Sequence, residues 1–98
     1  MDIRMNKNGT ELTVALNGRL DTLTAPGLEE KLETELQGIE SLVFDFAELK
    51  YISSAGLRVL LTAMQIMEEQ GSMVIRNVSS EVMDVFEVTG FVDDLNIE

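Results

Sequence analysis

The sequence predicts an α/β protein with a mixed sheet of four to five strands, an N-terminal antiparallel hairpin and packed helices. Two patterns predict this class. Near the N-terminus, apolar and polar residues alternate with the period of two that half-buried strands show. Further along, apolar residues at helical spacing alternate with short apolar runs, which indicates helices between strands. The 98 residues have the length of one domain, so we expect a single domain over residues 1–98.

The first two strands are expected to form the hairpin. Apolar residues alternate with mostly polar ones at Ile3, Met5, Leu12, Val14 and Leu16. Between the two runs, Lys7-Asn8-Gly9-Thr10 is typical of a hairpin turn. The second strand is predicted to end near Asn17.

The middle of the chain predicts a helix, a strand and a second helix. Leucines four residues apart, with glutamates between them, indicate a helix from about Ala25 to Gln37, ended by Gly38. The mostly apolar run Ser41–Phe46 is typical of a central strand that is covered on both faces. An apolar stripe from Ser54 onward then indicates a second helix, which is expected to run out at Gln70 before Gly71.

The last third of the chain predicts a strand, a helix and a short final strand. Met73–Ile75 is expected to be the strand, and Ser79 or Ser80 to cap the following helix. Gly90 is expected to close that helix, and Leu95–Ile97 to form the final short strand.

Polar residues are expected to collect at one edge of the sheet. Crossovers from strand to helix to strand are nearly always right-handed, which makes the strands that end near Asn17, Phe46 and Arg76 parallel. Sites in open α/β sheets form where the carboxyl ends of parallel strands meet. That edge is predicted to hold Asp21 and the segment Tyr51–Gly56.

The composition excludes several classes of function. Seven basic and eighteen acidic residues give a net charge of −11, which disfavours nucleic acids and anionic membranes as partners. Such acidity attracts a basic protein partner, although it also serves solubility. The absence of Cys and His excludes thiolate nucleophiles, structural zinc sites and Ser-His catalysis. With no secretion signal or membrane-spanning run, we expect a soluble, cytoplasmic chain without membrane insertion.

Two adjacent serines lie where the second helix is expected to begin. Ser53 and Ser54 lie near backbone N–H groups and a partial positive charge, which favours an anion. Helix capping accounts for one serine only. The three lysines include Lys50, which precedes the loop rather than facing Ser54, so we predict no catalytic residue. A hydroxyl that receives a phosphoryl group from another enzyme needs only exposure.

The segment Phe44–Leu61 resembles the signature of the STAS domain, and in particular that of bacterial anti-sigma factor antagonists. The resemblance extends to Gly18–Ala25 and to Thr89-Gly90-Phe91, so it covers nearly the whole chain. It implies a STAS-like fold and a partner-switching protein. In such a protein the unmodified domain binds an anti-sigma factor that is also a serine kinase, and phosphorylation of one serine ends the binding.

The resemblance also implies the site residues. The phosphorylated serine falls on Ser54. The position before it is commonly Asp in the family but is a second serine here, so Ser53 is the alternative. The family's frequent second hydroxyl falls on Ala55. The implied partner-binding residues are Asp21, Thr22, Ser53, Ser54, Gly56 and Arg58. Each of three has a plainer explanation: an Asx turn for Asp21, packing for Gly56 and a solvated helix position for Arg58.

Two other functions stay open at this point. A STAS subunit could dock on a membrane transporter complex without phosphorylation. A small enzyme or nucleotide-binding domain is disfavoured, because the chain has no glycine-rich phosphate loop. We expect no cofactor and no metal, since the pair Asp93-Asp94 fits a solvated terminus better than an oxygen-ligand site. The oligomeric state is not indicated by the sequence.

Overall fold

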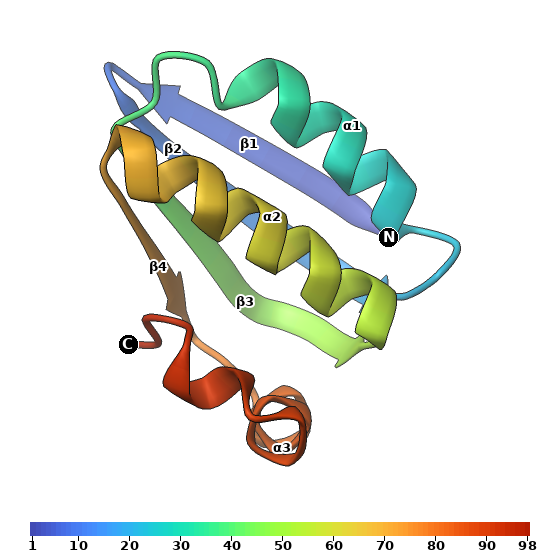
Figure 1. Ribbon diagram of the computed structural model, residues 1–98. Coiled ribbons are helices and arrows are strands. Elements are labelled where there is room, and N and C mark those ends of the chain that lie inside the picture. The colour runs from blue at the N-terminus through green and yellow to red at the C-terminus, as the bar shows by residue number, and fades with distance from the viewer.

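The computed structural model describes residues 1–98, which fold around one four-stranded sheet in the order β1-β2-β3-β4 (Figure 1). Strand β1 (Asp2–Asn8) pairs antiparallel with β2 (Glu11–Leu20) through a tight turn at Gly9, whose φ of 64° suits glycine. Strands β3 (Ser41–Ile52) and β4 (Ser72–Arg76) continue the sheet in parallel with β2. The mixed sheet with an N-terminal hairpin is therefore confirmed.

Two long helices lie side by side across one face of this sheet (Figure 1). Helix α1 (Ala25–Glu35) connects β2 to β3, and α2 (Ser54–Gln70) connects β3 to β4. Both connections advance in the same direction along the sheet, so right-handed crossovers place both helices on the same side. The predicted bounds of α2 are confirmed, whereas α1 ends two residues before the predicted Gln37.

The C-terminal part of the chain folds beside β3 and β4. Helix α3 (Ser80–Thr89) begins after Ser79, whose hydroxyl accepts a hydrogen bond from the N–H of Val82 at 3.3 Å. Gly90, with a φ of 81°, ends α3 before a single 3-10 turn (Phe91–Asp93). The predicted final strand is reduced to one bridge between Ile75 and Ile97, so the sheet has four strands.

The core between sheet and helices is entirely apolar. It comprises 23 buried residues in one cluster, and no polar or charged residue is buried. The strands contribute Leu12, Val14, Leu42 and Phe44, all with no exposed surface. Burial of this much apolar surface holds the ends of the strands in fixed positions.

Strands β2 and β3 are longer than the sequence predicted. The predicted ends near Asn17 and Phe46 are wrong, because the strands stay paired to Leu20 and Ile52. Two register shifts, between Ala15 and Asn17 and between Gly18 and Arg19, absorb extra residues of β3 and keep the pairing intact. As a result, Ser53 is the only residue between β3 and α2.

Candidate functional site

The site lies where β2 and β3 end side by side at the same edge of the sheet. Leu20 pairs with Ile52, and the N–H of Ser53 donates to the carbonyl of Leu20 at 2.9 Å. The turn that follows β2 and the start of α2 therefore leave the sheet together. The predicted placement of Asp21 beside the serine segment is confirmed.

The two serines are presented differently. Ser53 is the residue before α2, and its carbonyl accepts the N–H of Leu57 at 3.0 Å. The Ser53 hydroxyl is buried and has no hydrogen-bond partner, so it does not cap the helix. Ser54 is the first residue of α2 and is exposed. Ser54 is therefore the accessible serine of the two, and it lies at a helix end that no side chain caps.

Gly56 lies behind this surface instead of on it. The residue is buried, and a Cβ atom there would lie 2.7 Å from Cγ of Leu20 and 2.8 Å from Cγ1 of Ile52. These contacts correct the prediction that Gly56 belongs to the partner-binding surface. Only a residue without a side chain lets α2 pack this closely on the ends of β2 and β3. Packing therefore accounts for the glycine at this position.

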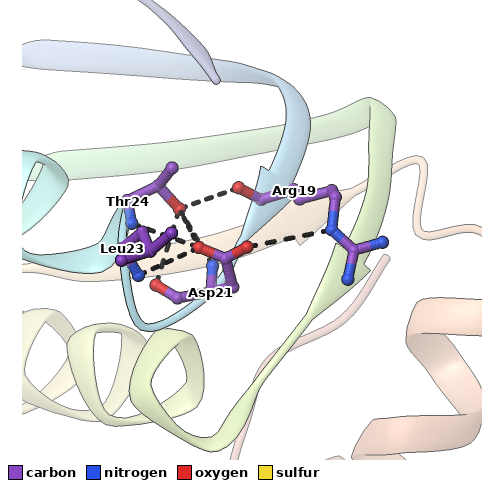
Figure 2. Close-up of polar contacts among 4 residues, drawn as sticks. All are labelled: Arg19, Asp21, Leu23 and Thr24. Atoms are coloured by element: carbon purple, nitrogen blue, oxygen red, sulfur yellow. Dashed lines mark hydrogen bonds and ion pairs between the residues drawn. The ribbon is translucent and has the colours of Figure 1, made fainter.

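Asp21 forms a tight turn that leads into α1, as Figure 2 shows. Its Oδ1 accepts the N–H groups of Leu23 at 3.0 Å and of Thr24 at 3.2 Å. The hydroxyl of Thr24 accepts the N–H of Asp21 at 2.9 Å and donates to the carbonyl of Arg19 at 2.8 Å. The turn expected as the plainer explanation is thus present, and it leaves Oδ2 of Asp21 free of backbone partners.

The free oxygen of Asp21 faces Arg19, a residue that the sequence analysis did not assign to the site. Nε of Arg19 lies 3.8 Å from Oδ2 of Asp21 (Figure 2). The guanidinium carbon of Arg19 also lies 4.3 Å from the ring centroid of Tyr51. Arg19 and Tyr51 are direct partners in the pairing of β2 with β3. The signal that was missed is the continuation of both strands, which places an arginine opposite an aromatic ring.

These contacts shift the pKa of Asp21. Partial burial raises the pKa of the carboxyl group, while the hydrogen bonds from Leu23 and Thr24 and the positive charge of Arg19 lower it. The lowering contributions win, so the pKa of Asp21 lies below its usual value of 3.8. Asp21 is therefore a carboxylate at neutral pH.

The remaining predicted site residues, Thr22 and Arg58, are both exposed. Thr22 is exposed in the turn after Asp21, and Arg58 is exposed on α2 one turn after Ser54. Arg58 takes part in none of the four ion pairs, whereas Lys50 lies 4.0 Å from Glu48. No group of three or more acidic, His or Cys side chains is arranged to hold a metal ion. The site therefore offers two exposed hydroxyl-bearing residues, Ser54 and Thr22, together with the carboxylate of Asp21 and two arginines.

The comparison with known families decides where this arrangement belongs. The family model of the STAS domain matches residues 2–98. The chain belongs to the STAS domain family. The suspected resemblance and the STAS-like fold are confirmed.

Similar STAS proteins include anti-sigma factor antagonists. BtrV of Bordetella bronchiseptica, described as an anti-sigma factor antagonist, is 39% identical over 93% of this chain and 80% of its own length. The anti-sigma-B factor antagonist of Bacillus subtilis is 29% identical over 99% of this chain and 88% of its own length. Proteins of this group are regulatory binding proteins and not enzymes, which confirms the expectation of a non-enzymatic chain.

Solved structures share the STAS fold at low sequence identity. An anti-sigma factor antagonist from Mycobacterium paratuberculosis matches 98% of this chain and 83% of its own with a TM-score of 0.87 and 18% identity. The phosphorylated form of the Bacillus cell fate determinant SpoIIAA matches 99% and 91% with a TM-score of 0.77 and 19% identity. Among the helices of this STAS domain, none is long and apolar enough to cross a membrane.

Proposed function

We propose that this STAS domain is an anti-sigma factor antagonist that acts in the cytoplasm and binds an anti-sigma factor with serine kinase activity. Phosphorylation of Ser54 ends the binding. The observation that carries the proposal is the exposed Ser54 at the uncapped start of α2, at the sheet edge that also holds the Asp21 turn, while the Ser53 hydroxyl is buried. The antagonist that is 39% identical supports the choice of partner class.

A phosphate on Ser54 changes the surface more than the fold. It adds about −1.5 to −2 charges, which a partner must desolvate or repel when it closes over the site. Within the domain, the N-terminus of α2 stabilises the anion, because the first N–H groups of a helix and its dipole favour negative charge. Arg58 lies one turn along α2 without an ion-pair partner, and is available to the same phosphate.

The site has the hydroxyl group that a kinase substrate needs, but it lacks the catalytic groups of a kinase or hydrolase. The nucleophilic hydroxyl of Ser54 has no histidine to take its proton, since the chain contains none. In phosphoryl transfer the kinase supplies the nucleotide and the base. The STAS domain contributes a serine held at a fixed edge of a rigid sheet.

The alternative function is docking on a membrane transporter complex without phosphorylation. Both functions use the same fold, so the decision depends on what happens at Ser54. A transporter partner requires no ATP and leaves Ser54 unmodified. Phosphorylation by an anti-sigma kinase distinguishes the two.

The deciding experiment is incubation of the domain with each anti-sigma kinase of its source organism and Mg-ATP. Trypsin cleaves after Lys50 and Arg58, so both serines fall in the peptide Tyr51–Arg58. Fragmentation in the mass spectrometer assigns the phosphate to one hydroxyl. We expect it on Ser54, with loss of the signal in Ser54→Ala and retention in Ser53→Ala. Phosphate on neither serine would favour transporter docking, and phosphate on Ser53 would overturn the assignment.

A further inference from the structure

Leu23 is the most exposed large apolar side chain of the domain. It is 90% exposed, and among large apolar residues only Val88 on α3, at 86%, comes close. Leu23 belongs neither to the core cluster nor to the partly buried apolar residues that pack against it. A leucine that keeps nearly all its surface in water contributes little to folding, because burial is the source of that stability.

The backbone around Leu23 is fixed by the turn that Asp21 forms. The N–H of Leu23 donates to Oδ1 of Asp21 at 3.0 Å, and the N–H of Ala25 donates to the carbonyl of Asp21 at 2.8 Å. Thr24 closes the turn by accepting the N–H of Asp21 at 2.9 Å (Figure 2). A side chain held out by such a turn binds a partner with little loss of backbone entropy.

The surroundings of Leu23 have the character of an interface. Leu23 lies in the turn that leaves the sheet together with the start of α2, where Ser54 is exposed. Tyr51, 38% exposed, adds a second apolar surface at this edge, and Arg19 stacks on it. The ion pair of Arg19 with Asp21 provides charge beside these apolar groups. Stable interfaces show this arrangement of a desolvated apolar centre within a polar rim.

We infer that Leu23 is an apolar anchor residue of this domain, which inserts into an apolar pocket on the anti-sigma kinase when that protein binds. The inference rests on the proposed function and deepens it, since it names the chemistry of the partner's surface. The pocket lies next to the kinase's active site, because Leu23 and Ser54 share one edge of the domain. Loss of the Leu23 side chain weakens binding even in a domain whose Ser54 cannot be phosphorylated.

The test measures binding by calorimetry, using the anti-sigma kinase that phosphorylates the wild-type domain. We expect Leu23→Ser to weaken binding about tenfold or more, and Leu23→Met, which keeps an apolar side chain, to restore most of it. Val88→Ser is the matched control, because it removes an equally exposed aliphatic group from α3. It should leave the affinity unchanged, and thermal unfolding should show that all three variants fold like the wild type.

The possible outcomes separate this inference from the proposed function. Wild-type affinity in Leu23→Ser overturns the inference and leaves the proposed function standing. An equal loss in Leu23→Ser and Val88→Ser also overturns it, because the effect would then follow from exposed apolar surface in general. A wild-type domain that neither binds nor is phosphorylated by any anti-sigma kinase overturns the proposed function, and the inference with it.

Discussion

Arg19 and Tyr51 face each other across β2 and β3, and the guanidinium carbon of Arg19 lies 4.3 Å from the centre of the tyrosine ring. From this position Arg19 also reaches Oδ2 of Asp21 at 3.8 Å. The stacked arginine thus occupies the one oxygen of Asp21 that the turn leaves free. It ties the end of the sheet to the charge of the candidate site.

Removal of the Arg19 charge is predicted to raise the pKa of Asp21. In Arg19→Met, the hydrogen bonds from Leu23 and Thr24 remain while the attraction of the cation is lost, so the pKa moves toward its usual 3.8. Carboxyl carbon shifts of Asp21 in an NMR pH titration measure this change. Lys50→Met is the control, because Lys50 pairs with Glu48 instead, and it should leave the titration of Asp21 unchanged.

The same lowered pKa predicts how Asp21 affects stability with pH. A carboxyl group with a lower pKa in the folded state stabilises the fold fully above its unfolded pKa, and this contribution is lost as the pH falls through the folded pKa. The stability difference between wild type and Asp21→Ala should therefore be constant above about pH 5 and shrink below 3.8. Urea unfolding across this range measures it. A difference that grows on acidification would contradict the lowered pKa.

The two serines that precede helices are predicted to respond differently to substitution by alanine. Ser79→Ala removes the hydrogen bond to the N–H of Val82 and should cost about 1 kcal/mol of unfolding free energy. Ser53→Ala removes a buried hydroxyl without a partner, so it should cost nothing or stabilise slightly. Chemical denaturation of both variants provides the comparison. An equal loss in both would show that Ser53 caps α2 after all.

Substitution of Gly56 by alanine is predicted to disturb the packing behind the site. The new methyl group would meet side-chain atoms of Leu20 and Ile52 at 2.7–2.8 Å, and overpacking of this kind costs roughly 1–3 kcal/mol. Gly27→Ala in α1 is the control, because no atom lies within 4 Å of its added Cβ, and it should stabilise the helix by about 0.5–1 kcal/mol. Thermal unfolding should show a lower Tm than the wild type for Gly56→Ala and a higher Tm for Gly27→Ala.

The charge at Ser54 is predicted to control partner binding without unfolding the domain. Ser54→Asp places a carboxylate at the exposed start of α2 and should weaken the anti-sigma kinase complex, whereas Ser54→Ala should preserve it. Calorimetry measures both affinities, and circular dichroism checks that the fold is kept. Equal affinities for the two variants would argue against an electrostatic switch.

Helix periodicity and the handedness of crossovers allowed two features to be predicted well from the sequence. The apolar stripe predicted α2, because a helix depends on residues three and four positions apart. Gly71, which follows Gln70, predicted where the helix ends. The meeting of Asp21 with the serine segment was predictable from the handedness of crossovers. Both inferences use rules that hold whatever the neighbouring strands contain.

Features that depend on pairing between strands were not predictable. The extension of β2 to Leu20 rests on register shifts against β3, and neither strand carries this information alone. The same extension places Arg19 on Tyr51 and buries Gly56 against Leu20 and Ile52. The different exposure of Ser53 and Ser54 follows from the single residue that joins β3 to α2.

That one-residue connection leaves no slack between the last paired position of β3 and the first turn of α2. One inserted residue would rotate the whole helix by about 100° relative to the strand, since a turn takes 3.6 residues. Either the leucines of α2 would leave the core or Ser54 would leave the exposed position that it has at the edge shared with the Asp21 turn. The spacing of these residues along the chain is therefore as constrained as their chemistry, and a homologue with an insertion at this point would have to give up the shared surface.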